Sequence, residues 1–174
     1  IVMRDIITAG GAFSTALDPF TPEQALDGLD QLARLHAASI DGSPAFGFGW
    51  AHSFLDRISR QPIIPQDSLQ ALLDGPRGEK LDPALRDAAR LQRALEGLAA
   101  EVRGGPLCLV HGDAHAGNVY REANGALGLV DWQILQKGNW AMDVAYHLAA
   151  VLTPEDRRAH ERALLSDYCI RLKA

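Results

Sequence analysis

The dipeptide Asn124-Gly125 is the feature that most constrains how this 174-residue chain can fold. Asn-Gly is a strong short-range hairpin signal, and short apolar segments, residues 119–121 and 126–130, stand on either side of it. A hairpin brings the outer ends of its two strands together. Asn118 and Asp131 flank those outer ends, so the turn predicts that these two polar residues lie close in space.

A second polar cluster precedes the hairpin, in the segment His-Gly-Asp-Ala-His-Ala-Gly-Asn at residues 111–118. Residues 107–110 are an apolar run that follows the breaker Gly-Gly-Pro at 104–106. This pattern predicts a buried strand that delivers Asp113 into a loop. We therefore expect Asp113, Asn118 and Asp131 to form one site.

These three side chains have the chemistry that phosphoryl transfer needs. Such a site places the accepting hydroxyl, holds Mg²⁺ on the nucleotide phosphates and spreads the developing charge. Asp113 suits the first task. Mg²⁺ takes a few protein oxygens and keeps its other positions for water and phosphates, which suits Asn118 and Asp131. The order Asp, Asn, Asp is also that of the catalytic and metal-binding residues of protein kinases.

Two other interpretations fit parts of the pattern. Taken singly, Asp113 and Asn118 are typical of turns, where Asp and Asn make local hydrogen bonds. His111, Asp113 and His115 have the residue types of a zinc site, which would indicate a metal-dependent hydrolase. Zinc needs a third strong ligand and an open coordination position, and the other histidines show no paired ligand spacing. The hairpin and Asp131 together favour phosphotransfer.

With these residues the chain resembles the C-terminal lobe of the aminoglycoside phosphotransferase and choline kinase-like family of small-molecule kinases. The family signature His-Gly-Asp-x-His-x-x-Asn falls at residues 111–118, and its Asp with an aromatic neighbour is Asp131-Trp132. Its Gly-x-x-x-x-Asp segment opens a helix at residues 138–143, and its Leu-Ala-x-Leu-His helix matches residues 32–36. Gln133, together with residues 143–146, resembles the ecdysteroid-kinase-like and other CHK-type branches more than the antibiotic-resistance enzymes.

The resemblance implies an α+β, mainly α-helical fold: the C-terminal lobe of a protein-kinase-like fold, with a small β-hairpin carrying the catalytic and metal-binding residues. It implies that Asp113 is catalytic, that Asn118 and Asp131 bind Mg²⁺, and that His111 and Asp143 brace the loop. ATP would be the phosphoryl donor, and a hydroxyl of a small molecule the acceptor. The alternative in another class is a non-catalytic, pseudokinase-like binding module.

By the same resemblance, residues 1–174 are a C-terminal catalytic lobe that begins at the inter-lobe hinge, at about residues 1–6. Val2 and Met3 would meet adenine there; an edge strand is the alternative. The N-terminal nucleotide-binding lobe is expected to be absent and to act as the partner of this one, because no phosphate loop precedes the signature. The sequence has three lysines, Lys80, Lys137 and Lys173. The last two follow the signature, and Lys80 lies in a polar turn rather than in a strand. Alone, the chain is expected to be inactive.

Composition narrows the function classes. The net charge is −5 and there is no block of Lys or Arg, which argues against a nucleic-acid partner. Without a signal peptide or a long apolar stretch, the sequence predicts no membrane partner and a cytoplasmic location. Cys108 and Cys169 form no metal-binding motif, and Cys108 is expected to be a core residue.

Helix signals fill the rest of the chain. Thr21 and Gln24 predict a capping box, and residues 82–83 predict the start of a second long helix with an apolar stripe. Residues 143–152 and the segment after Thr153 predict two more helices. Residues 41–66 read as an irregular segment whose aromatic residues line the acceptor pocket or pack over the core.

Overall fold

The computed structural model describes residues 5–41 and 50–173. The chain divides into two compact units, which are described separately. The larger unit comprises Ile1–Ala51 and Leu107–Ala174, and the smaller unit comprises His52–Pro106. None of the helices in the described ranges combines the length and apolar character needed to cross a membrane.

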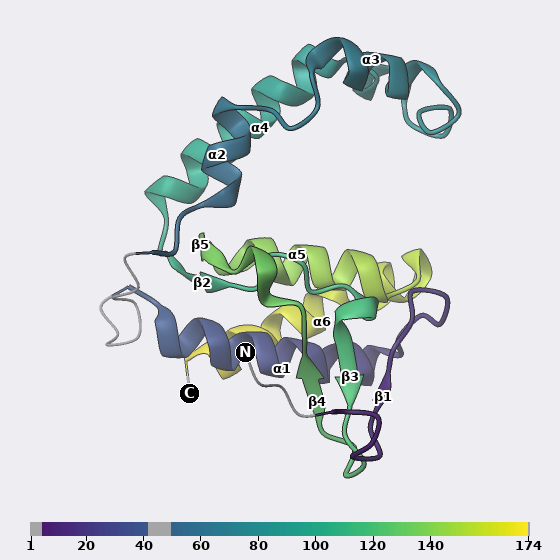
Figure 1. The fold of residues 1–174 in the computed structure, drawn as a ribbon, viewed down its shortest axis with the longest axis vertical. Coiled ribbons are helices and arrows are strands. Elements are labelled where there is room, and N and C mark those ends of the chain that lie inside the picture. Colours follow the sequence, from purple (N-terminus) through teal and green to yellow (C-terminus); the bar gives the residue numbers. More distant parts are fainter. Residues whose placement is uncertain (1–4, 42–49, 174) are drawn as a thin grey trace. The chain divides into compact units, whose positions relative to one another are not determined.

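The larger unit holds three α-helices and two small antiparallel sheets within its described residues (Figure 1). The helices are α1 (Pro22–Ser39), α5 (Trp140–Val151) and α6 (Pro154–Leu172). One sheet has the order β1-β3-β4, and the other pairs β2 with β5. The strands are β1 (Ala12–Phe13), β2 (Cys108–Val110), β3 (Val119–Arg121), β4 (Leu127–Leu129) and β5 (Gln136–Gly138). The predicted class, α+β and mainly α-helical, is confirmed.

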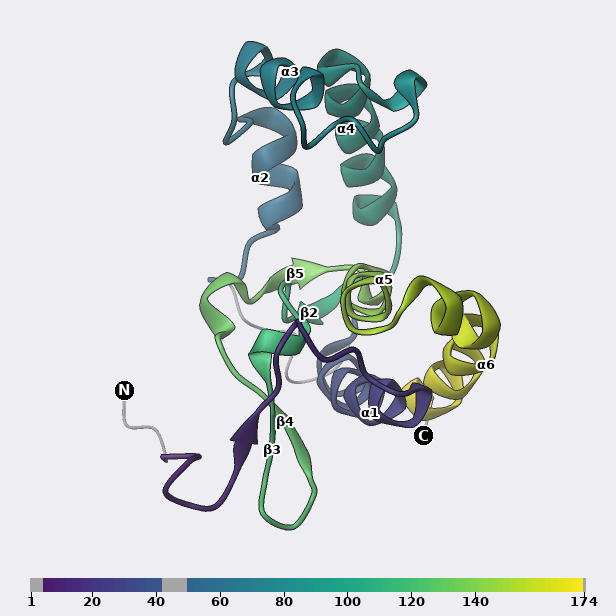
Figure 2. The same cartoon turned by 90° about the vertical axis from the view of Figure 1, so that its right-hand side faces the viewer.

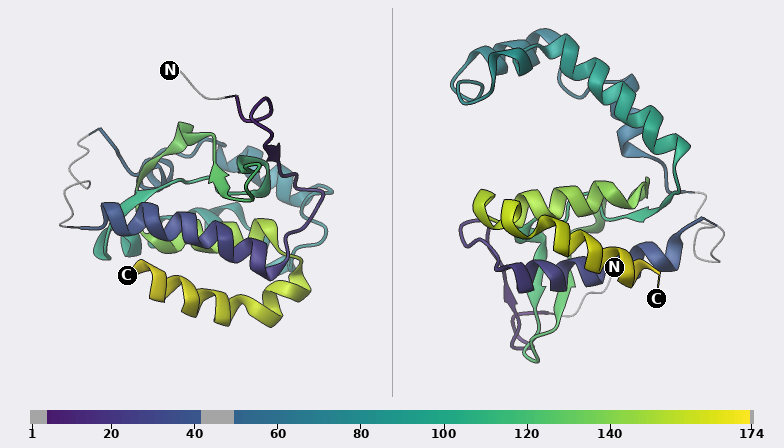
Figure 3. Two further views of the ribbon diagram at one scale, coloured as in Figure 1. Left: turned by 90° about the horizontal axis from the view of Figure 1, so that it is seen from below. Right: turned by 180° about the vertical axis from the view of Figure 1, so that it is seen from behind.

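The predicted capping box begins α1. The Thr21 hydroxyl accepts the Gln24 N–H at 3.3 Å, and the Gln24 side-chain oxygen accepts the Thr21 N–H at 3.0 Å. Two N–H groups without helical acceptors are thereby satisfied. Thr153 begins α6 in a related way, because its hydroxyl accepts the Asp156 N–H at 3.1 Å. Along its length α6 packs beside α1 (Figure 3).

The predicted hairpin is β3 and β4, and its loop has three residues. The Gly125 N–H donates to the Glu122 carbonyl, and the Glu122 N–H donates to the Ala126 carbonyl, each at 2.8 Å. Gly125 has φ +87°, a conformation that glycine adopts without steric cost. β1 pairs with the outer edge of β3, as Figure 2 shows.

The pairing of β2 with β5 was not predicted. The sequence indicated β2 but assigned no strand to the residues after Asp131. Instead Cys108 lies opposite Gly138 and Val110 lies opposite Gln136. Cys108 is a core residue, as expected, and burial raises the pKa of its thiol to about 12.

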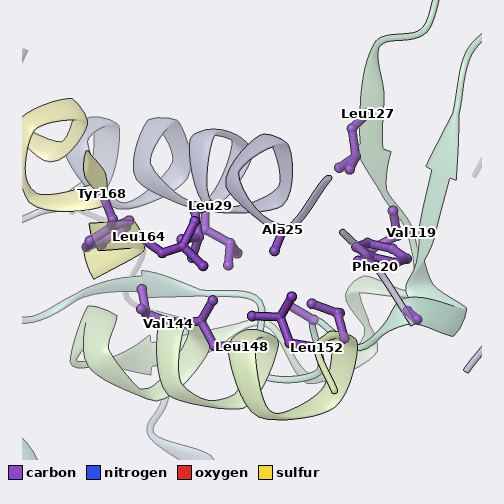
Figure 4. Packing of buried hydrophobic residues seen from close by; sticks show 14 of the residues in the cluster. Phe20, Ala25, Leu29, Val119, Leu127, Val144, Leu148, Leu152, Leu164 and Tyr168 are labelled. Atoms are coloured by element: carbon purple, nitrogen blue, oxygen red, sulfur yellow. The ribbon is translucent and has the colours of Figure 1, made fainter. Parts of the chain in front are cut away.

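The core of the larger unit lies between α1 and α5 and extends to the hairpin (Figure 4). Side chains of Ala25 and Leu29 on α1 face Val144 and Leu148 on α5 in that view. Val119 and Leu127, which lie on the core side of the hairpin, are buried in the same cluster. Burial of this apolar surface stabilises the unit and fixes the hairpin against α1.

Gly28 offers a test of how closely α1 and α5 pack. A Cβ at this position would lie 2.2 Å from Nε2 of the buried His147. We expect Gly28→Ala to lower the free energy of unfolding by about 2 kcal/mol, because this overlap outweighs the better helix propensity of alanine. Gly97, inside another helix, is the matched control, since a Cβ there meets nothing within 4 Å. Gly97→Ala should raise the free energy of unfolding by up to about 1 kcal/mol. If urea denaturation gave the same change in the free energy of unfolding for Gly28→Ala and Gly97→Ala, the close packing of α1 against α5 would be contradicted.

The smaller unit is helical in all its regular structure: α2 (Phe54–Arg60), α3 (Gln66–Asp74), a short 3₁₀ helix (Pro83–Leu85) and α4 (Ala88–Gly104). The prediction that residues 82–83 begin the long helix is wrong. Asp82 caps only the 3₁₀ helix, by accepting the Ala84 N–H, whereas Asp87 caps α4 by accepting the Arg90 N–H at 2.9 Å. A second Asp therefore starts the long helix.

Two further expectations for this unit need correction. The predicted apolar stripe, which was Leu85, Ala88, Leu91, Leu95 and Leu98, is only partly correct. Ala88 is buried, but Leu85 and Leu98 are exposed, and Ala99 and Val102 are buried in their place. Residues 41–66 are also not irregular throughout, because they contain α2, which Ser53 caps by accepting the Asp56 N–H.

Candidate active site

The loop after β2 is held by one buried carboxylate. Asp143, on α5, accepts the N–H of His111 at 2.6 Å and the N–H of Gly112 at 2.8 Å. Gly112 has φ +85° and lies so close to the Ile134 carbonyl that a Cβ would be 2.9 Å from it. Glycine is therefore required there. These hydrogen bonds are the contacts that a bracing role for Asp143 requires.

Asp143 also belongs to a buried polar chain. Nε2 of His36, on α1, lies 3.1 Å from the Asp143 carboxylate, and Nδ1 of His36 lies 2.8 Å from the Tyr168 hydroxyl on α6. All three side chains are fully buried. Burial raises the pKa of Tyr168, so its hydroxyl keeps its proton at neutral pH. This chain of contacts connects the loop to three helices.

His111 is committed to the backbone through both ring nitrogens. Nδ1 accepts the Asp113 N–H at 3.2 Å, and Nε2 donates to the Val130 carbonyl at 2.8 Å. A carbonyl can only accept, so Nε2 carries a proton. Nδ1 accepts the Asp113 N–H and therefore carries none. The buried ring also packs against Trp132, with centroids 4.5 Å apart. His111 thus has no free nitrogen for a metal ion or for proton transfer.

The Asp113 side chain is partly exposed, at 26%, and is surrounded by donors. Tyr146 donates its hydroxyl to Oδ1 at 3.1 Å, and the Asn118 amide donates to Oδ2 at 3.3 Å. Nε2 of His115 lies 3.7 Å from Oδ2. Burial raises the pKa of Tyr146, and its bond to Asp113 raises it further, so the tyrosine is a donor at neutral pH.

Asn118 has its amide turned toward the loop. Nδ2 donates to the Asp113 carbonyl at 2.8 Å as well as to the Asp113 carboxylate. Among the described residues, none donates a hydrogen bond to Oδ1 of Asn118. Nδ2 therefore fixes the buried side chain, and the oxygen is left available to a cation.

Asp131 follows the hairpin where the sequence predicted it. The Val130 N–H donates to the Asn118 carbonyl at 2.9 Å, which continues the β3–β4 ladder and places Asp131 one residue beyond it. The sequence did not predict its backbone: Asp131 has φ 62° and ψ 61°, a left-handed conformation that Asp tolerates better than most residues. Its side chain is exposed, with the Gln133 amide 3.4 Å from one carboxylate oxygen.

A cavity of about 690 Å³ opens beside Asp131 within the larger unit. Its walls come from the N-terminal segment, the hairpin and the 3₁₀ helix after it (Trp132–Ile134). Tyr120 lies on the hairpin wall, and its ring occupies the space that a side chain on Gly128 would take. The lining includes Ile6, Gly11, Tyr120, Leu129, Asp131 and Trp132.

Some predicted site residues lie outside the described part of the chain. Val2 and Met3, the predicted adenine contacts, are among them, as are Phe46 and Phe48 of the segment proposed for the acceptor pocket. Phe54, from the same segment, begins α2, and its ring is covered by the guanidinium of Arg57 at 5.0 Å. The acceptor-pocket interpretation stays a prediction.

The zinc interpretation gains no support from the geometry. In residues 5–41 and 50–173, no three His, Cys, Asp or Glu side chains gather as metal ligands. His111, one of the proposed ligands, is bonded to the backbone through both nitrogens. His115 also uses Nδ1, which accepts the Gly117 N–H at 3.0 Å.

Sequence reasoning missed Tyr146 and His147. Nδ1 of His147 donates to the Ala114 carbonyl at 2.7 Å, and burial lowers the pKa of this ring, which favours its neutral form. The signal was helical spacing: residues three and four positions after Asp143 share its face of α5. A search for polar residues on that face would have found both.

Comparisons with known proteins agree with the predicted resemblance. Residues 8–173 match the model of the phosphotransferase enzyme family. Thiamine kinase of Escherichia coli strain K12 is 40% identical over 97 residues, which are 55% of this chain and 32% of that protein. The alignment thus spans about a third of this curated relative.

Solved structures with similar folds include the choline kinase LicA from Streptococcus pneumoniae, with a TM-score of 0.49 and 16% identity over 86% of this chain and 47% of that one. They also include an aminoglycoside-3'-phosphotransferase of type VIII, with a TM-score of 0.49 and 22% identity over 92% of this chain and 64% of that one.

Proposed function

Because the chain belongs to the phosphotransferase enzyme family, we propose that the protein it represents transfers the γ-phosphoryl group of ATP to a hydroxyl of a small molecule. The observation that carries this proposal is the placement of Asp113. Its partly exposed carboxylate is held by Tyr146 and Asn118, and Asn118 starts the hairpin whose other end is Asp131. The catalytic carboxylate, the amide and the second carboxylate would thus form one site at this end of the hairpin.

Asn118 and Asp131 would hold Mg²⁺. The donor set fits this ion, because Oδ1 of Asn118 accepts no hydrogen bond from the described residues and the Asp131 carboxylate is exposed. Two protein oxygens leave the remaining positions to water and phosphates, as Mg²⁺ prefers. When bound, the ion neutralises charge on the transferred phosphoryl group. The cavity beside Asp131 is large enough for a nucleotide base and ribose.

Asp113 would act on the acceptor. Its carboxylate accepts the hydrogen bond of the incoming hydroxyl and orients the oxygen for attack on phosphorus. The proton passes to the carboxylate as the new O–P bond forms, while the bond from the γ-phosphorus to the β–γ bridging oxygen breaks and ADP leaves. His111 and Asp143 take no proton in this scheme. They fix the loop backbone, so that the carboxylate does not have to reorganise during the reaction.

A further nucleotide-binding lobe would complete the site. Family enzymes use a lysine from such a lobe on the phosphates. In this chain, Lys137 lies on β5, Lys80 belongs to the smaller unit and Lys173 follows α6. The relatives above are considerably longer than the matched region. We therefore propose that the lysine comes from residues outside this sequence.

The acceptor is proposed from the comparisons, and thiamine is its first candidate. Its hydroxyethyl group is a primary alcohol, and thiamine kinase is the relative with 40% identity. Choline and an aminoglycoside are the next candidates, after the two structural relatives.

The test is to incubate the full-length protein with Mg-ATP and each of the three acceptors, and to detect the gain of one phosphoryl group by mass spectrometry. We expect a phosphorylated product with at least one acceptor, and none without Mg²⁺. Tight Mg-ATP binding without any product would favour the non-catalytic, pseudokinase-like module. Tightly bound zinc with hydrolysis, and no transfer from ATP, would favour the metal-dependent hydrolase.

A further inference from the structure

One face of α5 contacts four consecutive residues of the catalytic loop. Asp143 accepts the backbone N–H groups of His111 and Gly112, and His147 donates to the Ala114 carbonyl. Tyr146, between them on the same helical face, bonds to Asp113. Three of these four loop residues are held by their backbones. Of these four residues, only Asp113 is contacted by the helix through its side chain.

The contact with Tyr146 defines where the Asp113 carboxylate points. A tyrosine side chain has few rotatable bonds, and its ring stands on a helix already fixed by Asp143 and His147. The ring edge also meets His115, with centroids 6.5 Å apart. At 3.1 Å, the hydroxyl is the nearest side-chain donor to the Asp113 carboxylate, compared with 3.3 Å for the Asn118 amide. The Asn118 amide makes its shorter bond, 2.8 Å, to the Asp113 backbone.

We propose that Tyr146 is a positioning residue for Asp113, and this inference rests on the proposed function. The hydroxyl of Tyr146 occupies one lone-pair site of Oδ1 and so fixes the orientation of the carboxylate. The remaining lone-pair sites then face the acceptor hydroxyl in one orientation. Tyr146 does not touch the reacting atoms in this account. It acts only through Asp113.

The position of Tyr146 separates this role from a contribution to folding. The residue is 44% exposed, unlike Asp143 and His147, which are fully buried. Removing an exposed hydroxyl leaves its partner open to water, so the cost in stability is small. The cost in rate is larger, because transition-state stabilisation depends on a fixed orientation. A Tyr146→Phe variant should therefore fold normally and react slowly.

The test is a double-mutant cycle in the full-length protein, using Mg-ATP with water as the phosphoryl acceptor. This probe does not require the natural acceptor to be known. We expect Tyr146→Phe to lower kcat about tenfold while the KM for Mg-ATP changes less than about twofold. In an Asp113→Asn background, followed under single-turnover conditions, Tyr146→Phe should cause no further loss.

Ala149 supplies the matched control, because it is exposed on the same helix and is not one of the three residues, Asp143, Tyr146 and His147, that bond to the loop. Ala149→Gly weakens the helix, yet it should leave kcat unchanged. An equal loss of kcat in both variants would make the effect of Tyr146 merely structural and overturn the inference.

The remaining outcomes are distinct. If Asp113→Asn abolishes hydrolysis but Tyr146→Phe leaves kcat unchanged, Tyr146 does not position Asp113 and only this inference fails. If Tyr146→Phe costs the same in both backgrounds, it does not act through Asp113, which also overturns the inference. If Asp113→Asn retains the wild-type rate, the proposed function itself fails.

Discussion

Replacing Asp113 by asparagine in the full-length protein should lower kcat for phosphoryl transfer about a thousandfold. Asparagine keeps the size of the side chain and an oxygen that can accept from Tyr146, so the loop should keep its shape. It cannot take the proton of the acceptor hydroxyl. The affinity for Mg-ATP should change little, because Asn118 and Asp131 hold the metal in this account. Rapid-quench kinetics gives kcat, and titration calorimetry gives the Mg-ATP affinity.

An exposed carboxylate on α6 provides the control for that prediction. Asp167 lies away from the loop, on the helix that ends the described chain, and Asp167→Asn should leave kcat unchanged. If Asp113→Asn turned over at a rate close to that of the wild type, Asp113 would not be the catalytic residue.

The largest effect on stability is expected at Asp143. Its fully buried carboxylate accepts two backbone N–H groups and lies against His36, so Asp143→Ala leaves three donors without their partner, two of them buried and one, the Gly112 N–H, partly buried. We expect a loss of about 4 kcal/mol in the free energy of unfolding. Urea denaturation measures this loss as a lower transition midpoint.

Asp113→Ala is the matched control for Asp143, because Asp113 belongs to the same loop but is partly exposed. It should lower the free energy of unfolding by less than about 1 kcal/mol. The bracing role of Asp143 would be excluded if the two variants unfolded at the same urea concentration.

Local signals in the sequence predicted those parts of the fold that local chemistry determines. Thr21 and Gln24 satisfy each other's N–H groups within one turn, and the loop around Gly125 closes over three residues. Neither contact depends on the rest of the chain. The hairpin is local as well, and it brings the backbones of Asn118 and Asp131 toward each other without help from the rest of the chain.

Features that depend on distant partners were missed. β5 pairs with β2, which lies much earlier in the sequence, and the residues of β5 are too polar to indicate a strand on their own. The contact between Tyr146 and Asp113 likewise requires α5 to lie against the loop. The start of the long helix was also misplaced. Asp82 with Pro83 has the pattern of a helix start but caps only the short 3₁₀ helix, whereas Asp87, five residues later, caps α4.

The left-handed backbone of Asp131 was also beyond a sequence pattern. A non-glycine residue in this conformation carries a cost of about 1 kcal/mol, and such residues cluster at functional sites. Here it turns the chain sharply after β4, between the ladder and the 3₁₀ helix that follows. Asp131 therefore lines the cavity, as the magnesium-binding proposal needs.

The central claim is that Asp113, Asn118 and Asp131 form one magnesium-dependent phosphotransfer site. A crystal structure of the full-length protein with Mg²⁺ and a non-hydrolysable ATP analogue tests it most directly. The account predicts Mg²⁺ bound by Oδ1 of Asn118 and the Asp131 carboxylate at about 2.1 Å, with Asp113 facing the γ-phosphate but not ligating the ion. A metal ion on His115 and Asp113, or a nucleotide bound away from Asp131, would contradict it.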